Sequence, residues 1–341
     1  MIRRRLVLGV ISGALGLMAA LSVAGCSQKP EPAAQQQTKE IVFGILPAEN
    51  QASMGPLWEP LLDEMSKQTG VKVTARYVTN YAGLIEAMRF KQVQMGWFSA
   101  LPALDAVQRA DGEVLGRVID RGGAETYTSI LIVKKGSGIT LDKVLACGQR
   151  YSFGIGDPQS TSGTLAPMAY LFTPRNIEPT KCFKTVRSAS HQANSAAVAN
   201  GVQDVATNNS VGLLFAKRDT PKIGNALEVI WSSPPLPESS IIVRKDLDPA
   251  LKEKMRQFFL TYGTGTGPDA DKQRKVLEGL AYGGFRPADD SYLDPVREMQ
   301  ASVELSNARK TGDPAKIAAA QAAFDKIHAA AEQKRAKEPN I

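Results

Sequence analysis

Apolar blocks alternate with polar turns along the chain, at spacings that predict strands and helices in turn. Residues 42–46 (VFGIL) and 152–156 (SFGIG) are strand-like, and Phe43 and Phe153 lie 110 residues apart. Each is followed by a polar turn and a helix-like apolar run with an early proline, PLWEPLLDEM in the first case and TLAPMAYLF in the second. A proline is tolerated there because the first helical N–H groups have no partner within the helix.

The similarity between the two halves continues beyond these helices. Residues 71–77 and 184–188 are strand-like, and they lead to helices opened by Tyr81 and His191, again 110 residues apart. Both helices run through a short turn into a further strand, VQMGWF or VQDVAT. The order strand, helix, strand, helix, strand predicts an α/β protein with two lobes, each a mostly parallel sheet flanked by helices.

The first 26 residues follow a different pattern. Three arginines precede residues 6–25, which carry no charge, and the run ends in VAGC at 23–26. This is typical of a bacterial signal peptide with a lipobox, in which Cys26 would be lipidated and become the mature N-terminus. An uncleaved membrane anchor is the alternative, because 20 uncharged residues could span a bilayer. We expect an exported protein, periplasmic or at the cell surface, held to a membrane through Cys26.

Two similar strand-like segments, residues 129–137 and 239–247, flank the second repeat. We interpret them as the crossings between the lobes, forming a two-strand hinge. The C-terminal stretch is rich in Ala, Lys and Glu, and predicts a surface helix on the first lobe or a loosely held tail. The expected parts are a signal peptide (1–25), a lipidated cysteine with a polar tether (26–39), a first lobe (40–132 and 240–312), a second lobe (133–239) and a C-terminal helix or tail (313–341).

The composition, 43% hydrophobic and 22% charged, is that of a folded globular protein. Removing the three signal-peptide arginines lowers the formal net charge from +7 to +4. Lys and Arg residues form no stripe interleaved with aromatic residues, so nucleic-acid binding is not expected. Cys147 and Cys182 each stand just ahead of a strand-like segment, and such a pair in an exported protein predicts a disulfide. Metal ligation is the weaker alternative because no histidine lies nearby, and no metal or cofactor is expected.

The stretch GDPQSTSG at residues 156–163 carries the candidate chemistry. Its first half predicts a turn, and Ser160 is a favoured helix N-cap. Thr161, Ser162 and Gly163 would then form a first helical turn, whose free N–H groups and hydroxyls favour an anion. No lysine follows, so the segment is not a nucleotide-binding loop. A well-capped helix without ligand is the alternative.

The repeat directs this helix toward a cleft. Ligands of α/β sheets bind beyond the carboxyl ends of the strands, where the helices opened by Tyr81, His191 and Ser160 begin. His191 could in principle activate a serine, but the chain has no GxSxG elbow, no clear acid partner for the ring, no HExxH motif and no glycine-rich dinucleotide loop. We therefore expect a binding protein and not an enzyme.

These segments together resemble the phosphonate- and phosphite-binding proteins of bacterial ABC importers. The resemblance extends from residue 40 to about residue 305 and is carried by FGILPAEN, NYAGLIEAMRF, MGWF, GDPQSTSG, SASHQAN and NGVQDVATNN followed by WSSPPLPESSIIVRK. It implies a periplasmic-binding-protein clamp of type II that closes on a small phosphorus oxyanion and delivers it to an ABC permease and ATPase. It also implies that the protein is a monomer.

The resemblance implies a site of hydroxyl, imidazole and phenol donors. Each type donates a hydrogen bond without the strong hydration of a lysine ammonium. For Tyr127, which begins an apolar strand, packing is the alternative. The implied ligand-binding residues are Tyr81, Tyr127, Ser160, Thr161, Ser162 and His191.

Departures from the family concern specificity. Members that prefer aminoalkylphosphonates are expected to carry carboxylates where this chain has Val211 and Ser239, although the adjacent Glu238 could replace one of them. Asn50 and Asn208 are further candidate specificity residues. A buried ammonium without a carboxylate is costly, so the sequence predicts a preference for phosphite, methylphosphonate or another compact oxyanion over 2-aminoethylphosphonate. The alternatives are a binding protein for phosphate or a sulfonate, and an extracytoplasmic enzyme acting on a phosphoryl group.

Overall fold

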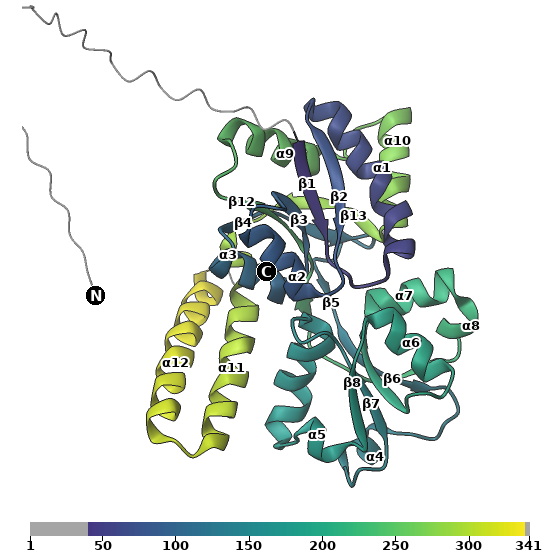
Figure 1. Ribbon diagram of the computed structural model, residues 1–341, viewed down its shortest axis with the longest axis vertical. Helices are drawn as coiled ribbons and strands as arrows, with labels where there is room; N and C mark the ends of the chain where they lie inside the picture. The colour runs from purple at the N-terminus through teal and green to yellow at the C-terminus, as the bar shows by residue number, and fades with distance from the viewer. Residues whose placement is uncertain (1–39, 338–341) are drawn as a thin grey trace, which may run out of the picture. The chain divides into compact units, whose positions relative to one another are not determined.

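The computed structural model describes residues 40–337 (Figure 1). The expected signal peptide, Cys26 and the whole of the tether lie outside the described residues. Within the described part, no helix combines the length and apolar character needed to cross a membrane. The described residues form two α/β lobes, which confirms the predicted fold class.

The first lobe is built on a six-stranded sheet of order β13-β4-β12-β3-β1-β2. Its strands are β1 (Glu40–Ile45), β2 (Lys72–Tyr77), β3 (Met95–Phe98), β4 (Gly112–Asp120), β12 (Ser240–Arg244) and β13 (Tyr282–Pro287). Its helices are α1 (Gln51–Thr69), α2 (Tyr81–Arg89), α3 (Ala100–Arg109), α9 (Pro249–Thr261) and α10 (Pro268–Gly279). Phe43 of β1 packs against Trp58 of α1 and Phe259 of α9, so helices far apart in sequence share one core.

The second lobe is built on a five-stranded sheet of order β10-β6-β9-β7-β8. Its strands are β6 (Ser129–Lys134), β7 (Ser152–Ile155), β8 (Thr185–Ser188), β9 (Val205–Asn209) and β10 (Leu227–Ser232). Its helical segments are α4 (Leu141–Leu145), η1 (Thr161–Leu165), η2 (Met168–Phe172), η3 (Thr173–Arg175), α5 (Pro179–Cys182), α6 (His191–Ala199), α7 (Ser210–Asp219) and α8 (Pro221–Gly224). Phe153, Phe172 and Phe183 stack in a core separate from that of the first lobe.

Both sheets are mixed, whereas the sequence predicted mostly parallel sheets. In the first, β1 pairs in parallel with β2 and β3, but β12 runs antiparallel to β3 and β4. In the second, β7 is parallel to β8 and β9, but β6 is antiparallel to β9. Strands β6 and β12 each arrive from the other lobe at the edge where the parallel strands end. They must therefore run back in the opposite direction, without a helical crossover.

The lobes are joined by two short strands, β5 (Thr126–Tyr127) and β11 (Leu236–Pro237), which pair antiparallel. Because β6 belongs wholly to the second sheet, the first crossing lies a few residues before the expected boundary at residue 132. Tyr292 further ties the crossings together, since its hydroxyl donates to the carbonyls of Glu125 and Glu238 at 3.3 and 3.2 Å. The connection is thus a two-strand hinge, and Tyr292 attaches it to the first lobe through these two hydrogen bonds.

Cys147 and Cys182 form a disulfide, as their spacing ahead of strands predicted. The strands that follow them, β7 and β8, are paired neighbours in the second sheet. Cys182 is buried in the core of the second lobe. The bridge therefore closes the loop that contains GDPQSTSG.

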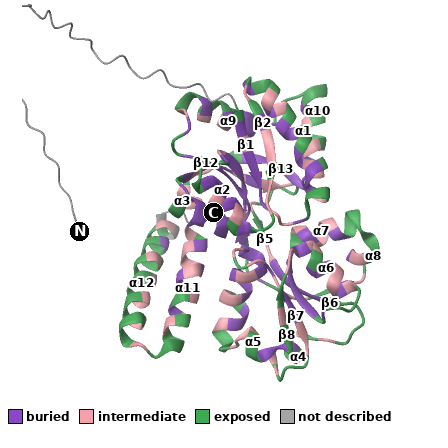
Figure 2. Ribbon diagram, viewed as in Figure 1, coloured by how far each residue is buried: buried purple, intermediate pink, exposed green. Residues whose placement is uncertain are grey.

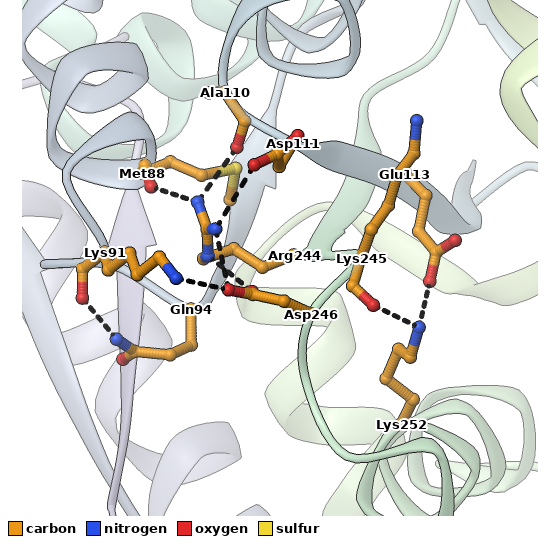
Figure 3. A network of polar contacts seen from close by, with 10 residues as sticks. All are labelled: Met88, Lys91, Gln94, Ala110, Asp111, Glu113, Arg244, Lys245, Asp246 and Lys252. Atoms are coloured by element: carbon orange, nitrogen blue, oxygen red, sulfur yellow. Dashed lines mark hydrogen bonds and ion pairs between the residues drawn. The ribbon is translucent and has the colours of Figure 1, made fainter.

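Arg244, at the end of β12, is almost fully buried and holds two helices in place (Figure 3). Its guanidinium donates to the carbonyls of Met88 at 2.7 Å and Ala110 at 3.1 Å, near the C-terminal ends of α2 and α3. It also pairs with Asp246 at 2.8 Å. These bonds satisfy carbonyls that have no partner within their own helices. They anchor the far end of the helix whose first residue is Tyr81.

The chain ends in a helical hairpin formed by α11 (Asp294–Thr311) and α12 (Pro314–Lys337), which follow the short segment η4 (Asp290–Leu293). The predicted C-terminal helix packs along α11, and Lys334 pairs with Asp294 at 3.0 Å. Helix α11 in turn contacts α3 in the first lobe and η2 in the second. Figure 2 shows the central strands of both sheets as mostly buried, whereas the edge strands β2 and β8 and much of α12 are more exposed.

Candidate functional site

A cavity of about 60 Å³ lies between the lobes, where the helices of both repeats begin. Eight of the residues singled out from sequence line it: Tyr81, Tyr127, Ser160, Ser162, His191, Val211, Glu238 and Ser239. Thr161, Asn50 and Asn208 do not line it. The structure therefore brings most of the predicted residues to one place, although they are separated by up to 158 positions in the chain.

The turn before η1 is formed by two glycines in close contact. The amide of Gly156 donates to the carbonyl of Gly163 at 3.0 Å. A Cβ atom on Gly156 would come within 2.5 Å of the Gly163 Cα, so neither position has room for a side chain. Ser160 is the predicted N-cap, because its hydroxyl accepts from the Gly163 amide at 2.9 Å. This packing turns Ser160 and Ser162 toward the cavity.

His191 faces this pair of hydroxyls from the start of α6. Its Nε2 lies 3.5 Å from the Oγ atoms of both Ser160 and Ser162. Burial lowers the pKa of His191 to about 4, so the ring is neutral at physiological pH. Its Nδ1 has no hydrogen-bond partner among residues 40–337. A neutral imidazole can donate one hydrogen bond to an anion without bringing a full charge.

Two phenols approach the serines from the other side of the cavity. Tyr81 begins α2, and Tyr127 lies in the hinge strand β5. Burial raises the pKa of both phenols, while the neighbouring hydroxyls of Ser160 and Ser162 partly oppose that rise. Both phenols therefore keep their protons and can donate. Tyr127 also packs against the core of the first lobe, so the packing role weighed from sequence accompanies its place in the cavity.

Thr161 has a different position from the one expected. Its hydroxyl accepts from the Leu101 amide at 2.8 Å and lies 3.3 Å from the Ser99 hydroxyl, both in the first lobe. Because its neighbours in the helix point to the cavity, Thr161 necessarily points elsewhere, here across the lobe boundary. It links the lobes, and no cavity-lining role is seen for it.

The two asparagines outside the cavity have structural partners. Asn50 caps α1 through the Ser53 amide at 2.9 Å, and its own amide donates to Gln192 at 3.1 Å. The Asn208 side chain donates to the His191 carbonyl at 3.2 Å and to the Ser195 hydroxyl at 2.6 Å. Asn208 therefore helps to position His191 and does not face the cavity.

Asn209 and Glu49 are among the wall residues that sequence reasoning did not single out. Asn209 donates to the Ser162 hydroxyl at 3.3 Å, and its side chain also caps α7. The ATNN motif contains Asn209, so a signal was present. Glu49 is only 8% exposed, and burial raises its pKa to about 8. The only sequence signal for a role of Glu49 in the site was its position in the polar turn after the first strand.

Carboxylates line the cavity even though Val211 and Ser239 stand at the positions where the family comparison leads one to expect acids. Val211 and Ser239 line it as predicted, but Glu238 and Glu49 line it as well. Burial raises the pKa of Glu238 to about 7, against a hydrogen bond of 2.9 Å from the Ser239 amide. The turn places the side chain of Glu238 at the cavity along with Ser239, which is the alternative that the sequence left open.

Comparison with known proteins gives consistent matches. Residues 43–293 match the family described as ABC transporter, phosphonate, periplasmic substrate-binding protein. The chain is 39% identical over 277 residues to the phosphonates-binding periplasmic protein of Escherichia coli, covering 81% of this chain and 80% of that protein. It is 27% identical over 306 residues to the phosphate-import protein PhnD of Mycolicibacterium smegmatis, covering 82% and 92%.

Two solved structures have the same fold. A binding protein component of an ABC phosphonate transporter from Pseudomonas aeruginosa has a TM-score of 0.82 and 35% identity, covering 89% of this chain and 100% of that one. A Prochlorococcus marinus protein in complex with methylphosphonate has a TM-score of 0.68 and 21% identity, covering 77% and 97%.

Proposed function

Because the chain belongs to the family of phosphonate-binding periplasmic components of ABC transporters, we propose that it captures an organophosphonate in the cavity between its lobes and delivers it to a membrane permease. The observation that carries the proposal is the convergence of uncharged donors from both lobes. Ser160, Ser162 and His191 come from the second lobe, Tyr81 comes from the first and Tyr127 from the hinge.

This donor set suits a tetrahedral oxyanion. Hydrogen bonds to a charged group contribute about 1.5–3 kcal/mol each, so four or five of them give micromolar binding or better. No lysine, arginine or metal-binding cluster lines the cavity in the described part of the chain. The phosphonate oxygens would thus be bound by dipoles alone, which costs little desolvation of the protein groups.

The rest of the wall favours a carbon substituent over a fourth oxygen. A mostly apolar surface faces the cavity beside the hydroxyl cluster, and an additional phosphate oxygen against it would lose much of its hydration. This supports a phosphonate over phosphate or sulfate. The apolar wall is formed by Leu46, Met54, Leu57, Trp97, Val211, Phe215 and Leu280.

Contacts between the lobes support a clamp that closes over the ligand. The amide of Tyr81 donates to Asp157 at 3.3 Å, and the amide of Leu101 donates to Thr161 at 2.8 Å. These bonds join groups on different lobes, so they exist only when the lobes are together. Ligand that bridges the same two lobes would favour this closed arrangement.

Calorimetric titration of the purified mature protein tests the ligand class. We expect methylphosphonate to bind with micromolar or lower Kd, and phosphate and sulfate to bind at least about tenfold more weakly, because a fourth oxygen loses hydration against the mostly apolar wall. Phosphite, which lacks the methyl group, is measured alongside. Phosphate binding as tight as methylphosphonate would contradict the proposal, and steady turnover of any ligand would point to the enzyme alternative.

We infer from the sequence that the protein is exported and held to a membrane by lipid on Cys26. The supporting feature is the uncharged run that ends in VAGC. Fractionation of cells expressing the full chain is expected to find it in the membrane, and Cys26→Ser is expected to move it out of the lipoprotein fraction. Absence of any lipid-dependent mass shift in the wild-type protein would refute the inference. Gel filtration of the mature protein tests the expected monomer.

A further inference from the structure

Glu49 lies on the boundary between two cavities. It stands in the turn between β1 and α1, directly before the cap residue Asn50. It lines the 60 Å³ cavity and also an adjoining cavity of about 520 Å³ between α1, α6 and α7. The two cavities share five wall residues, Glu49, Met54, Leu57, Gly212 and Phe215.

The Glu49 carboxyl is buried without a basic partner. No residue that lines either cavity in the described part of the chain is a lysine or arginine, and His191 is neutral. Asp219, the other acid of the larger cavity, raises the pKa of Glu49 further and is itself paired with Arg218 at 2.6 Å. A lone buried carboxyl is costly when ionised.

Glu49 differs in this respect from the other acid of the small cavity. Glu238 accepts a hydrogen bond from the Ser239 amide at 2.9 Å and lies in the hinge turn. Among residues 40–337 the Glu49 carboxyl has no such bond, and its Oε1 lies against the start of α7, where a Cβ on Gly212 would come within 3.4 Å. The carboxyl therefore reaches from the first lobe to the second with its capacity as an acceptor still available.

We propose that Glu49 accepts a cationic group carried on the organic substituent of the ligand, while the hydroxyl cluster holds the phosphonate. This rests on the proposed function and specifies its ligand as a zwitterionic phosphonate. An ammonium group would stabilise the ionised carboxylate that burial otherwise disfavours. Glu49 would thus supply the acid that Val211 and Ser239 lack, from a different element of the fold. This proposal predicts the opposite of the preference for unaminated ligands that was expected from the sequence.

The test compares two ligands of equal shape, 2-aminoethylphosphonate and propylphosphonate, in which a methyl group replaces the ammonium. We expect calorimetry at pH 7.5 to show the wild-type protein binding the aminated ligand at least about tenfold more tightly. Glu49→Gln is expected to reduce this ratio to about twofold or less, because glutamine keeps the shape but not the charge. Glu59→Gln removes the same charge at an exposed position of α1 outside both cavities, and is expected to change the ratio less than about twofold.

The pH dependence supplies a second readout. Because the pKa of Glu49 is raised to about 8, the carboxyl is mostly protonated at pH 6.5 and mostly ionised at pH 9. Ionisation of the two phosphonates affects both proteins alike, so the difference between the pH profiles reports on Glu49. The preference for 2-aminoethylphosphonate over propylphosphonate, taken relative to that of Glu49→Gln, is expected to increase with pH in the wild-type protein. Neighbouring groups are Tyr81, which stays protonated in this range, His191, which stays neutral, and the acids Asp219 and Glu238. If Glu238, with its pKa of about 7, were the acceptor, the wild-type protein and Glu49→Gln would have the same pH profile.

The outcomes separate this inference from the proposed function. Tight binding of propylphosphonate or methylphosphonate with no preference for the amine, or equal weakening of both ligands by Glu49→Gln, would overturn the role of Glu49 alone. Failure of the wild-type protein to bind any phosphonate would overturn the proposed function. A thermal unfolding curve for Glu49→Gln like that of the wild type shows that a lost preference is not caused by misfolding.

Discussion

Replacing Tyr81 and Tyr127 together by phenylalanine is expected to weaken methylphosphonate binding by at least about 100-fold. Each substitution removes one hydroxyl that can donate to the anion, and such bonds to charged groups contribute about 1.5–3 kcal/mol each. Both rings remain, so the contact of Tyr127 with the first-lobe core is preserved. Calorimetry on the single and double variants measures the loss, and the two single losses show whether the phenols act independently.

The control for this pair is Tyr262→Phe. The Tyr262 hydroxyl donates to Glu64 at 3.0 Å, in the first lobe and outside the cavity. Its loss is expected to lower stability slightly and to leave affinity unchanged. Thermal unfolding of the Tyr81/Tyr127 double variant should stay close to the wild-type curve. A double variant that still binds with wild-type affinity would show that the anion is held by the second lobe alone.

Loss of the disulfide is expected to have the largest effect on stability. The bridge closes a loop with a sequence separation of 35 residues, and the chain-entropy treatment of such a loop gives about 3–4 kcal/mol. Cys147, Gly148 and Gln149 have consecutive positive φ values of 57°, 82° and 56°, a conformation that the bridge helps to hold. We expect Cys147→Ser combined with Cys182→Ser to lower the free energy of unfolding by this amount in urea titrations.

Reduction of the Cys147–Cys182 disulfide provides a second measurement of its contribution to the free energy of unfolding. Dithiothreitol should bring the wild-type protein close to the stability of the double variant and should leave the variant itself unchanged. Because η1 lies inside the closed loop, the affinity for phosphonate is also expected to become more sensitive to temperature. A loss of stability below about 1 kcal/mol would mean that packing around Cys182 holds the loop without the bridge.

The sequence predicted the elements that local chemistry determines. Ser160 as an N-cap, the cysteine pair and the helix starts at Tyr81 and His191 all follow from short-range patterns, and these are present in the structure. The reversed strands β6 and β12 could not be predicted in the same way. Their direction depends on which edge of a sheet the chain reaches after leaving the other lobe, and this is a property of the whole topology.

The side chains of the cavity wall also could not be predicted fully from short-range sequence patterns. Thr161 has the residue type expected of an anion ligand, but the helix rotates it toward Leu101. No sequence motif marks Glu49 as a site residue, but the turn after β1 places it in the wall of the cavity between the lobes. Whether a polar residue of a turn points inward depends on neighbours that are distant in sequence, here Gly212 and Phe215 of α7. Spacing alone carries no information about them.

The position of Tyr127 in a hinge strand bears on the order of events during ligand capture. Tyr81 lies on a first-lobe helix anchored by Arg244, so any opening of the clamp carries it away with that lobe. Tyr127 is paired with Leu236 at the pivot and directly precedes the strand that enters the second lobe, so it moves little relative to the serines. An arriving anion would therefore meet Tyr127 with the second lobe at first encounter, and Tyr81 last. Tyr127 would thus belong to the surface that first binds the ligand, and Tyr81 to the lobe that closes over it.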